Sequence, residues 1–205
     1  MSEHEYSVVG HSRSRVGMVI AFISGAVAGG LTTVAGFAAS YLEDQQIELP
    51  EIILWPLTGG VVFAILFLIF NKFIWRISRL RNIIGIPDIS GTWKLKGQSF
   101  GINNEPKYDW EGSVEITQSY EKITVFLKTP QSSSQSISAA IVSEGRPGFR
   151  LIYSYRNQPK PGESDMAAHI GHCELLFSSD LASAEGHYFN GGGRFTHGNM
   201  ALTKA

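Results

Sequence analysis

An uncharged run from Val16 to Leu42 constrains this chain more than any other feature. It exceeds the roughly 20 residues that a helix needs to cross the hydrocarbon core of a bilayer. A second uncharged run, from Ile52 to Asn71, contains the segment VVFAILFLIF. Because the backbone must satisfy its own hydrogen bonds in lipid, both runs are predicted to be transmembrane helices. A cleavable signal peptide is the alternative for the first run, but this apolar stretch is too long for the typical hydrophobic region of a signal peptide, and a second span follows.

Basic residues flank the two runs, and acidic residues lie between them. Arg13 and Arg15 precede the first run, and the segment 72–81 after the second run contains four basic residues. The connecting segment 43–51 carries only acidic charges. Since Lys and Arg near a span favour the cytoplasmic side, both chain termini are predicted to be cytoplasmic.

Small residues recur every four positions in the first run. Gly25 and Gly29, and likewise Ala26 and Gly30, form small-xxx-small pairs that let two helix backbones approach closely. Gly25, Gly29 and Gly30 are therefore candidate membrane-association residues. They pack either the two helices of one hairpin or the helices of neighbouring molecules. Neither run has an ionisable residue at its centre, which argues against a proton relay or an ion-coupled transporter.

From Ile89 onward, apolar and polar residues alternate in short segments separated by turn signals, which is typical of an all-β barrel or sandwich. About eight strands are predicted, near residues 89–97, 110–119, 122–129, 135–143, 148–157, 169–179, 182–190 and 194–204. Eight strands close into a lipocalin-like antiparallel barrel that holds one small ligand. An immunoglobulin-like sandwich is the alternative, but it usually has a core disulfide, and Cys173 is the only cysteine in the sequence.

The predicted fold class is therefore an all-β C-terminal domain preceded by two transmembrane α-helices. The expected parts are a cytoplasmic N-terminal tail (1–15), a transmembrane hairpin (16–76), a basic juxtamembrane neck (77–87) and a β-barrel domain (88–205). Basic and apolar residues interleave from Lys72 to Arg81, at the entry to the neck, as in helix ends that emerge through anionic headgroups. The neck is interpreted as a membrane anchor rather than a nucleic-acid surface.

Motifs for catalysis are missing from the sequence. It contains no Walker-type glycine loop, no Cys-x-x-Cys, no His-Glu-x-x-His and no Gly-x-Ser-x-Gly elbow. His169 and His172 are three positions apart on a predicted strand, so their side chains point to opposite faces and do not suit a shared metal. Neither an enzyme, nor a cofactor, nor a metal site is predicted.

Two matches then point to a known family. Gly91-Thr92-Trp93 is similar to the Gly-x-Trp start of lipocalin-like barrels. The order of two spans, a basic neck, DISGTWKLKG and a final GHYFNGGGRFTHGNMALTK resembles the two-transmembrane β-barrel effectors of bacterial CBASS anti-phage defence, encoded beside a CD-NTase nucleotidyltransferase. The resemblance implies a receptor in the bacterial inner membrane. Its barrel would bind a cyclic dinucleotide, and the chain would then oligomerise and disrupt the membrane, causing abortive infection.

A cyclic dinucleotide presents two bases and two phosphates, so its pocket requires aromatic platforms and cationic or N–H donors. Under this resemblance, the expected ligand-binding residues are Tyr153, Tyr155, Tyr188, Arg194 and Thr196. Tyr153 and Tyr155 also fit the ordinary filling of a barrel core. Arg194 also fits a cation–π contact over the Trp93 ring at the closed end. Arg150 and Arg156 alternate to the outer face, where protein contacts are expected.

Other functions remain compatible with the same residues. One is a membrane-tethered lipid or fatty-acid carrier, whose cavity should be almost wholly apolar. Another is a structural scaffold without a ligand, and an enzyme that degrades the nucleotide is the least supported. For the receptor, the expected partners are a cyclic dinucleotide, the lipid bilayer and other copies of the chain, with no nucleic acid.

Overall fold

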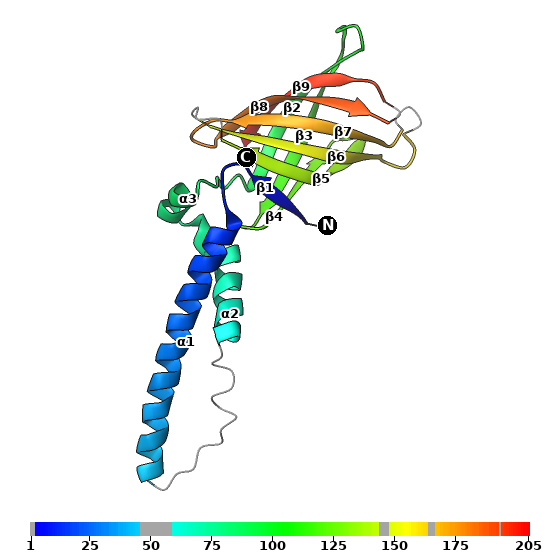
Figure 1. Ribbon diagram of the computed structural model, residues 1–205. Coiled ribbons are helices and arrows are strands. Elements are labelled where there is room, and N and C mark those ends of the chain that lie inside the picture. The colour runs from blue at the N-terminus through cyan, green and yellow to red at the C-terminus, as the bar shows by residue number, and fades with distance from the viewer. Residues whose placement is uncertain (1–2, 46–58, 144–147, 164–166, 193) are drawn as a thin grey trace. The chain divides into compact units, whose positions relative to one another are not determined.

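The computed structural model describes residues 3–45, 59–143, 148–163, 167–192 and 194–205 (Figure 1). The chain folds into two compact units. One consists of Ser12–Leu80, and the other combines Met1–His11 with Arg81–Ala205. The N-terminal residues therefore belong to the same unit as the C-terminal domain.

The first unit is helical. It contains α1 (Arg13–Asp44), α2 (Gly59–Lys72) and the short 3-10 helix η3 (Ile74–Arg76), and α3 (Ser78–Ile84) follows across the unit boundary. Within the described residues, α1 is the one helix long and apolar enough to cross a membrane, whereas α2 is a shorter apolar helix. Residues 52–58 of the second predicted span lie outside the described part of the chain. That second span therefore stays a prediction.

Helices α1 and α2 pack against each other. The buried residues of α1 are Ile20, Ser24 and Ala28, which recur every four positions on one helix face. The Ser24 hydroxyl donates to the Ile20 carbonyl at 2.6 Å, so this polar group is satisfied inside its own helix. The glycines of the predicted small-residue pairs are exposed, and a methyl group at any of them would meet no atom within 4 Å.

In the described part of the second unit, nine strands form a β-sheet. Its strands are β1 (His4–Val8), β2 (Gly91–Phe100), β3 (Pro106–Gln118), β4 (Lys122–Lys128), β5 (Ser132–Val142), β6 (Phe149–Pro159), β7 (His169–Phe177), β8 (Ser183–Gly191) and β9 (His197–Lys204). They pair in the order β1-β4-β3-β2-β9-β8-β7-β6-β5, and the additional β1–β5 and β4–β5 pairings close the ladder into a barrel. All eight predicted strands are present.

Strand β1, which was not among the eight predicted strands, corrects the prediction that residues 1–15 form a tail. Residues 4–8 form β1, in which Tyr6 and Val8 are buried while Glu5 and Ser7 are exposed. This alternation is the normal pattern of a half-buried strand, but five residues are too few to distinguish it from a polar tail by sequence alone.

The interior of the barrel is apolar at one end. Trp93, at the start of β2, is fully buried, and its ring meets Phe177 edge to face with centroids 5.2 Å apart. The ammonium of Lys204 lies over the Trp93 ring, 5.4 Å from its centroid. The proposed alternative of Arg194 over Trp93 is therefore wrong, because Lys204 from the last strand makes that contact.

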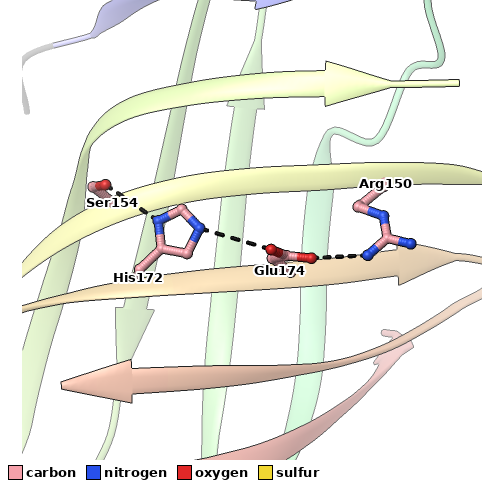
Figure 2. Close-up of polar contacts among 4 residues, drawn as sticks. All are labelled: Arg150, Ser154, His172 and Glu174. Atoms are coloured by element: carbon pink, nitrogen blue, oxygen red, sulfur yellow. Dashed lines mark hydrogen bonds and ion pairs between the residues drawn. The ribbon is translucent and has the colours of Figure 1, made fainter.

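The outer surface of β6 and β7 carries a chain of polar contacts (Figure 2). An Arg150 Nη donates to the Glu174 carboxylate at 2.8 Å. His172 lies between that carboxylate and the Ser154 hydroxyl, at 4.0 and 3.4 Å. These contacts confirm that Arg150 faces outward, as its alternation with Leu151 predicts.

Candidate functional site

A cavity of about 310 Å³ lies inside the barrel at the end opposite Trp93. Strands that run away from the Trp93 end contribute their last residues to the lining. Strands that run toward the Trp93 end contribute their first residues. Examples are Ser99 at the end of β2 and His169 at the start of β7. The interior is thus divided into a filled apolar end and an open polar end.

Four of the five residues expected to bind the ligand line this cavity: Tyr153, Tyr155, Tyr188 and Arg194. Thr196 is buried but is not among the lining residues. Its hydroxyl accepts a hydrogen bond from the Asn190 side-chain amide at 2.8 Å, and its carbonyl accepts one from the Asn190 backbone at the same distance. Thr196 therefore orients Asn190, which does line the cavity.

The phenols of the cavity are held in place by hydrogen bonds. The Tyr155 hydroxyl donates to the Asn190 side-chain oxygen at 2.8 Å, and the Tyr188 hydroxyl pairs with the Ser99 hydroxyl at 2.6 Å. Burial is the main cause that raises the pKa of Tyr153, Tyr155 and Tyr188. All three phenols are therefore neutral near pH 7 and keep their hydroxyl protons.

Charge in the lining is concentrated near the mouth. Arg194 donates to the Tyr108 hydroxyl, and both residues line the cavity. Asp109 and Glu111 also border it, but from the outward-facing positions of β3. There Asp109 accepts a hydrogen bond from the Gln98 side-chain amide at 2.9 Å. Arg194 is thus placed to receive an anionic group that enters the barrel.

Three aromatic rings of the lining lie directly over inward-facing glycines. A methyl group on Gly97 would stand 2.3 Å from the Trp110 ring, and one on Gly171 would stand 2.4 Å from the Tyr155 ring. A methyl group on Gly198 would meet the Tyr188 ring at 2.7 Å. Because real Cβ atoms do not come this close, the three glycines allow the rings to lie against the wall and leave the centre open.

Sequence reasoning missed several polar lining residues. The most informative are Ser134, Asn157, His169 and Asn190. Asn157 continues the alternation that puts Tyr153 and Tyr155 inside, so its inward direction was available from the sequence. A run of inward polar residues at strand ends is the signal that distinguishes a polar pocket from a filled core, since buried polar groups need partners.

Metal binding and thiol chemistry depend on the positions of the described His, Cys, Asp and Glu side chains. Among the described residues, no group of three or more His, Cys, Asp or Glu side chains is arranged to hold a metal. His169 faces the cavity and His172 the outer surface, so the predicted opposite directions are confirmed. Burial raises the pKa of the Cys173 thiol to about 12, which makes it a poor nucleophile.

Comparisons with known proteins show the family to which this chain belongs. Residues 84–204 match the family model described as the cyclic dinucleotide receptor domain of Cap15, and residues 14–76 match the Cap15 TM helices. The chain belongs to the Cap15 family. CD-NTase-associated protein 15 from Yersinia aleksiciae is 36% identical over 207 residues, which cover all of this chain and 98% of that protein.

Membership of the Cap15 family confirms the resemblance seen in the sequence. The chain is a CBASS-associated membrane protein of antiviral defence with a cyclic dinucleotide receptor domain, and this family is not a known enzyme family. The receptor-domain match covers β2 to β9, including every strand that lines the cavity. Strand β1 precedes both matched ranges.

The Gly97→Ala variant of this Cap15 protein is expected to bind cyclic dinucleotides about 5- to 150-fold more weakly, the range that corresponds to loss of one stacked base. The added methyl group displaces the Trp110 ring from the wall into the cavity. Calorimetric titration of the full-length protein measures the effect. Gly191→Ala is the matched control, because a methyl group there meets nothing within 4 Å. Equal affinities for both variants would show that the position of the Trp110 ring does not affect cyclic dinucleotide binding.

His169 should make stability depend on pH. Burial, followed by the Arg194 charge, lowers the pKa of this imidazole, although its hydrogen bond to the Ala167 carbonyl opposes the shift. The unfolded chain therefore takes up the His169 proton at a higher pH than the folded chain, so stability falls as pH drops below about 6.5. Thermal melts between pH 7.5 and 5 should show a smaller fall for His169→Gln than for the wild type. Equal slopes would contradict this assignment.

Proposed function

We propose that the barrel cavity is the cyclic dinucleotide site, and that ligand binding makes the chain self-associate and disrupt the inner membrane during infection. The observation that carries the proposal is the joint placement of aromatic rings and a guanidinium in one open cavity. Trp110, Tyr155 and Tyr188 supply the rings, and Arg194 supplies the positive charge. A volume of about 310 Å³ is at the lower end of the usual range for small-molecule sites.

The chemistry of the lining favours a nucleotide over a lipid. Each base has a π-face that stacks on an aromatic ring with a gain of about 1–3 kcal/mol. Arginine matches phosphate oxygens with two parallel N–H donors. A fatty-acid carrier would have an almost wholly apolar cavity, whereas this one presents polar groups from Ser134, Asn157 and Asn190. In this proposal Tyr153 and Thr196 support the site, the former as a wall residue and the latter through Asn190.

The proposed membrane response starts from the free face of α1. The buried residues of α1 are Ile20, Ser24 and Ala28, whereas Gly25, Gly29 and Gly30 are exposed in the described helical unit. Small residues on an exposed helix face permit close packing with helices of other copies. We place two spans in the inner membrane with both termini in the cytoplasm, where nucleotides are made. The basic flanks of the two apolar runs support this orientation.

The ligand must favour the associated state by its differential affinity. Moving a population from about 1:99 to 99:1 requires roughly 5.5 kcal/mol. Two stacked bases and two phosphate contacts are of this order. The effect does not require catalysis, because tighter binding to the associated state is enough to shift the equilibrium.

The test uses full-length protein in lipid nanodiscs and in dye-loaded vesicles. Thermal melts are recorded with a panel of cyclic dinucleotides and with fatty acids. A ligand at 100 times its dissociation constant stabilises the folded state by about 2.7 kcal/mol. We expect a shift with at least one cyclic dinucleotide, larger crosslinked oligomers and dye release. A shift with fatty acids alone would exclude the nucleotide site, and saturating ligand without a change in oligomer size would exclude the self-association.

A further inference from the structure

Strand β1 fills a gap in the wall of the barrel. β4 and β5 pair directly only where Phe126–Lys128 meet Ser133–Gln135. Beyond that point β1 lies between them, antiparallel to β4 and parallel to β5 (Figure 1). We call this gap between β4 and β5 the seam. A five-residue strand has little stability of its own, so its order depends on the seam that holds it.

Ser136 marks the point where the seam opens. Its hydroxyl accepts a hydrogen bond from the Val125 backbone N–H at 2.9 Å. This side-chain contact takes the place of a backbone hydrogen bond between β4 and β5. The same hydroxyl lies 2.7 Å from His4 Nε2, at the first residue of β1. The register of β5 against β6 also shifts between Ser136 and Ser138. Ser134, two residues before this point, lines the cavity.

At the other end of the seam, β1 is joined to the segment that leads into β2. The Gln118 side chain is buried and forms hydrogen bonds with Tyr6, Pro87 and Ile89. Its amide nitrogen donates to the Tyr6 hydroxyl at 3.1 Å and to the Pro87 carbonyl at 3.0 Å. Its oxygen accepts from the Ile89 backbone at 3.0 Å. One side chain therefore fixes both chain segments that connect the barrel to the helices.

The attachment continues to the last residues before α1. His11 Nε2 lies 2.9 Å from the Tyr120 hydroxyl, and the two rings meet edge to face. The Val9 backbone donates to the Ile141 carbonyl at 2.9 Å. Residues 9–12 alone separate β1 from Arg13, the first residue of α1. The start of α1 is thus covalently close to a strand of the receptor wall.

We propose that the seam is a strand-binding groove whose occupant is the N-terminal segment His4–Val8, and that this bound strand transmits ligand binding in the cavity to α1. The part that concerns transmission rests on the proposed function above. Backbone pairing gives such a groove its affinity, as when an extended peptide adds to a sheet. The strands that form the seam also supply Leu127, Ser132 and Ser134 to the cavity wall. A ligand that changes the separation of β4 and β5 therefore moves Ser136, where the seam opens, and with it strand β1.

The first experiment tests occupancy of the groove without any ligand. Hydrogen exchange of the full-length protein in nanodiscs is followed at the amides of residues 6–9. We expect slow exchange in the wild type and fast exchange in Tyr6→Ala, which loses a buried ring and the hydrogen bonds of its hydroxyl to Gln118 and Ser119. Fast exchange in the wild type would show that His4–Val8 does not occupy the groove, independently of any ligand.

The second experiment tests transmission with a locked strand. Glu5 and Lys122 are exposed partners in the antiparallel β1–β4 pair, so Glu5→Cys/Lys122→Cys can form a disulfide across them. The native Cys173 is fully buried and does not compete. Glu5→Cys alone and the reduced double variant are the controls. The probe is the cyclic dinucleotide that most stabilises the wild type, and dye release from vesicles is the readout.

We expect the oxidised lock to respond like the wild type, because the strand stays in place while it transmits. Tyr6→Ala should bind the probe with unchanged affinity but need about 2- to 30-fold more of it for half-maximal release. Equal half-maximal concentrations for Tyr6→Ala and wild type would overturn transmission. A locked protein that responds only after reduction would show that the strand must leave the seam, which also overturns the proposal. If the wild type binds no probe, the proposed function is wrong. The hydrogen-exchange experiment then still tests whether His4–Val8 occupies the groove.

Discussion

Arg194→Ala should weaken cyclic dinucleotide binding by about 10- to 150-fold, since a hydrogen bond to a charged group contributes about 1.5–3 kcal/mol. The guanidinium lines the cavity and donates to the Tyr108 hydroxyl, so it is already oriented when the ligand arrives. Isothermal titration of full-length protein measures the loss. Arg194→Lys should be intermediate, because lysine keeps the charge but not the two parallel donors.

Arg156→Ala is the matched control for this prediction. It removes the same charge from an exposed position of β6 that does not line the cavity. Its affinity should stay close to that of the wild type when the salt concentration is fixed. Equal losses for Arg194→Ala and Arg156→Ala would mean that general electrostatic attraction, and not a phosphate contact, accounts for the effect of Arg194.

The sequence predicts the inward side of most strands because alternation is a local property. Trp93 and Leu95 on β2, and Tyr153 and Tyr155 on β6, all point into the barrel as expected. The division into an apolar helical part and an all-β domain could likewise be predicted, since each solvent selects its own pattern of residues. These features need no knowledge of which strand lies beside which.

The features that the sequence misses depend on pairing between distant residues. Trp110 contributes to the cavity wall because the register puts it opposite Gly97, where no side chain obstructs its ring. His4–Val8 forms a strand that pairs with both β4 and β5, and this position depends on residues more than 100 positions away in the sequence. A five-residue segment carries no periodic signal strong enough to predict this.

Thr196 shows the same limit at shorter range. The family resemblance implied a ligand-binding role for Thr196, and in the structure its hydroxyl and its carbonyl both accept hydrogen bonds from Asn190. Gly192 has a φ of +67°, which a residue without a Cβ adopts easily and which helps β8 turn toward β9. Gly193 lies outside the described residues.

Trp93→Ala is expected to lower the free energy of unfolding of the barrel by about 3–5 kcal/mol, the usual cost of truncating a buried Trp. The ring is fully buried, packs on Phe177, lies under the Lys204 ammonium and donates from its indole nitrogen to the Ile89 carbonyl at 3.3 Å. Alanine loses all of these contacts and leaves a cavity at the apolar end. Denaturant unfolding of the full-length protein, followed by circular dichroism of the β-sheet, measures the change.

The location of Trp93 separates stability from ligand binding in this variant. Trp93 lies at the end of the barrel opposite the cavity, so the affinity of the folded fraction for a cyclic dinucleotide should be unchanged at low temperature. Ile102→Ala is the control, because Ile102 is 78% exposed and its truncation should change stability by less than about 0.5 kcal/mol. If Trp93→Ala instead weakened binding without loss of stability, the two ends of the barrel interior would be coupled. The division into an apolar support and a separate polar site would then be wrong.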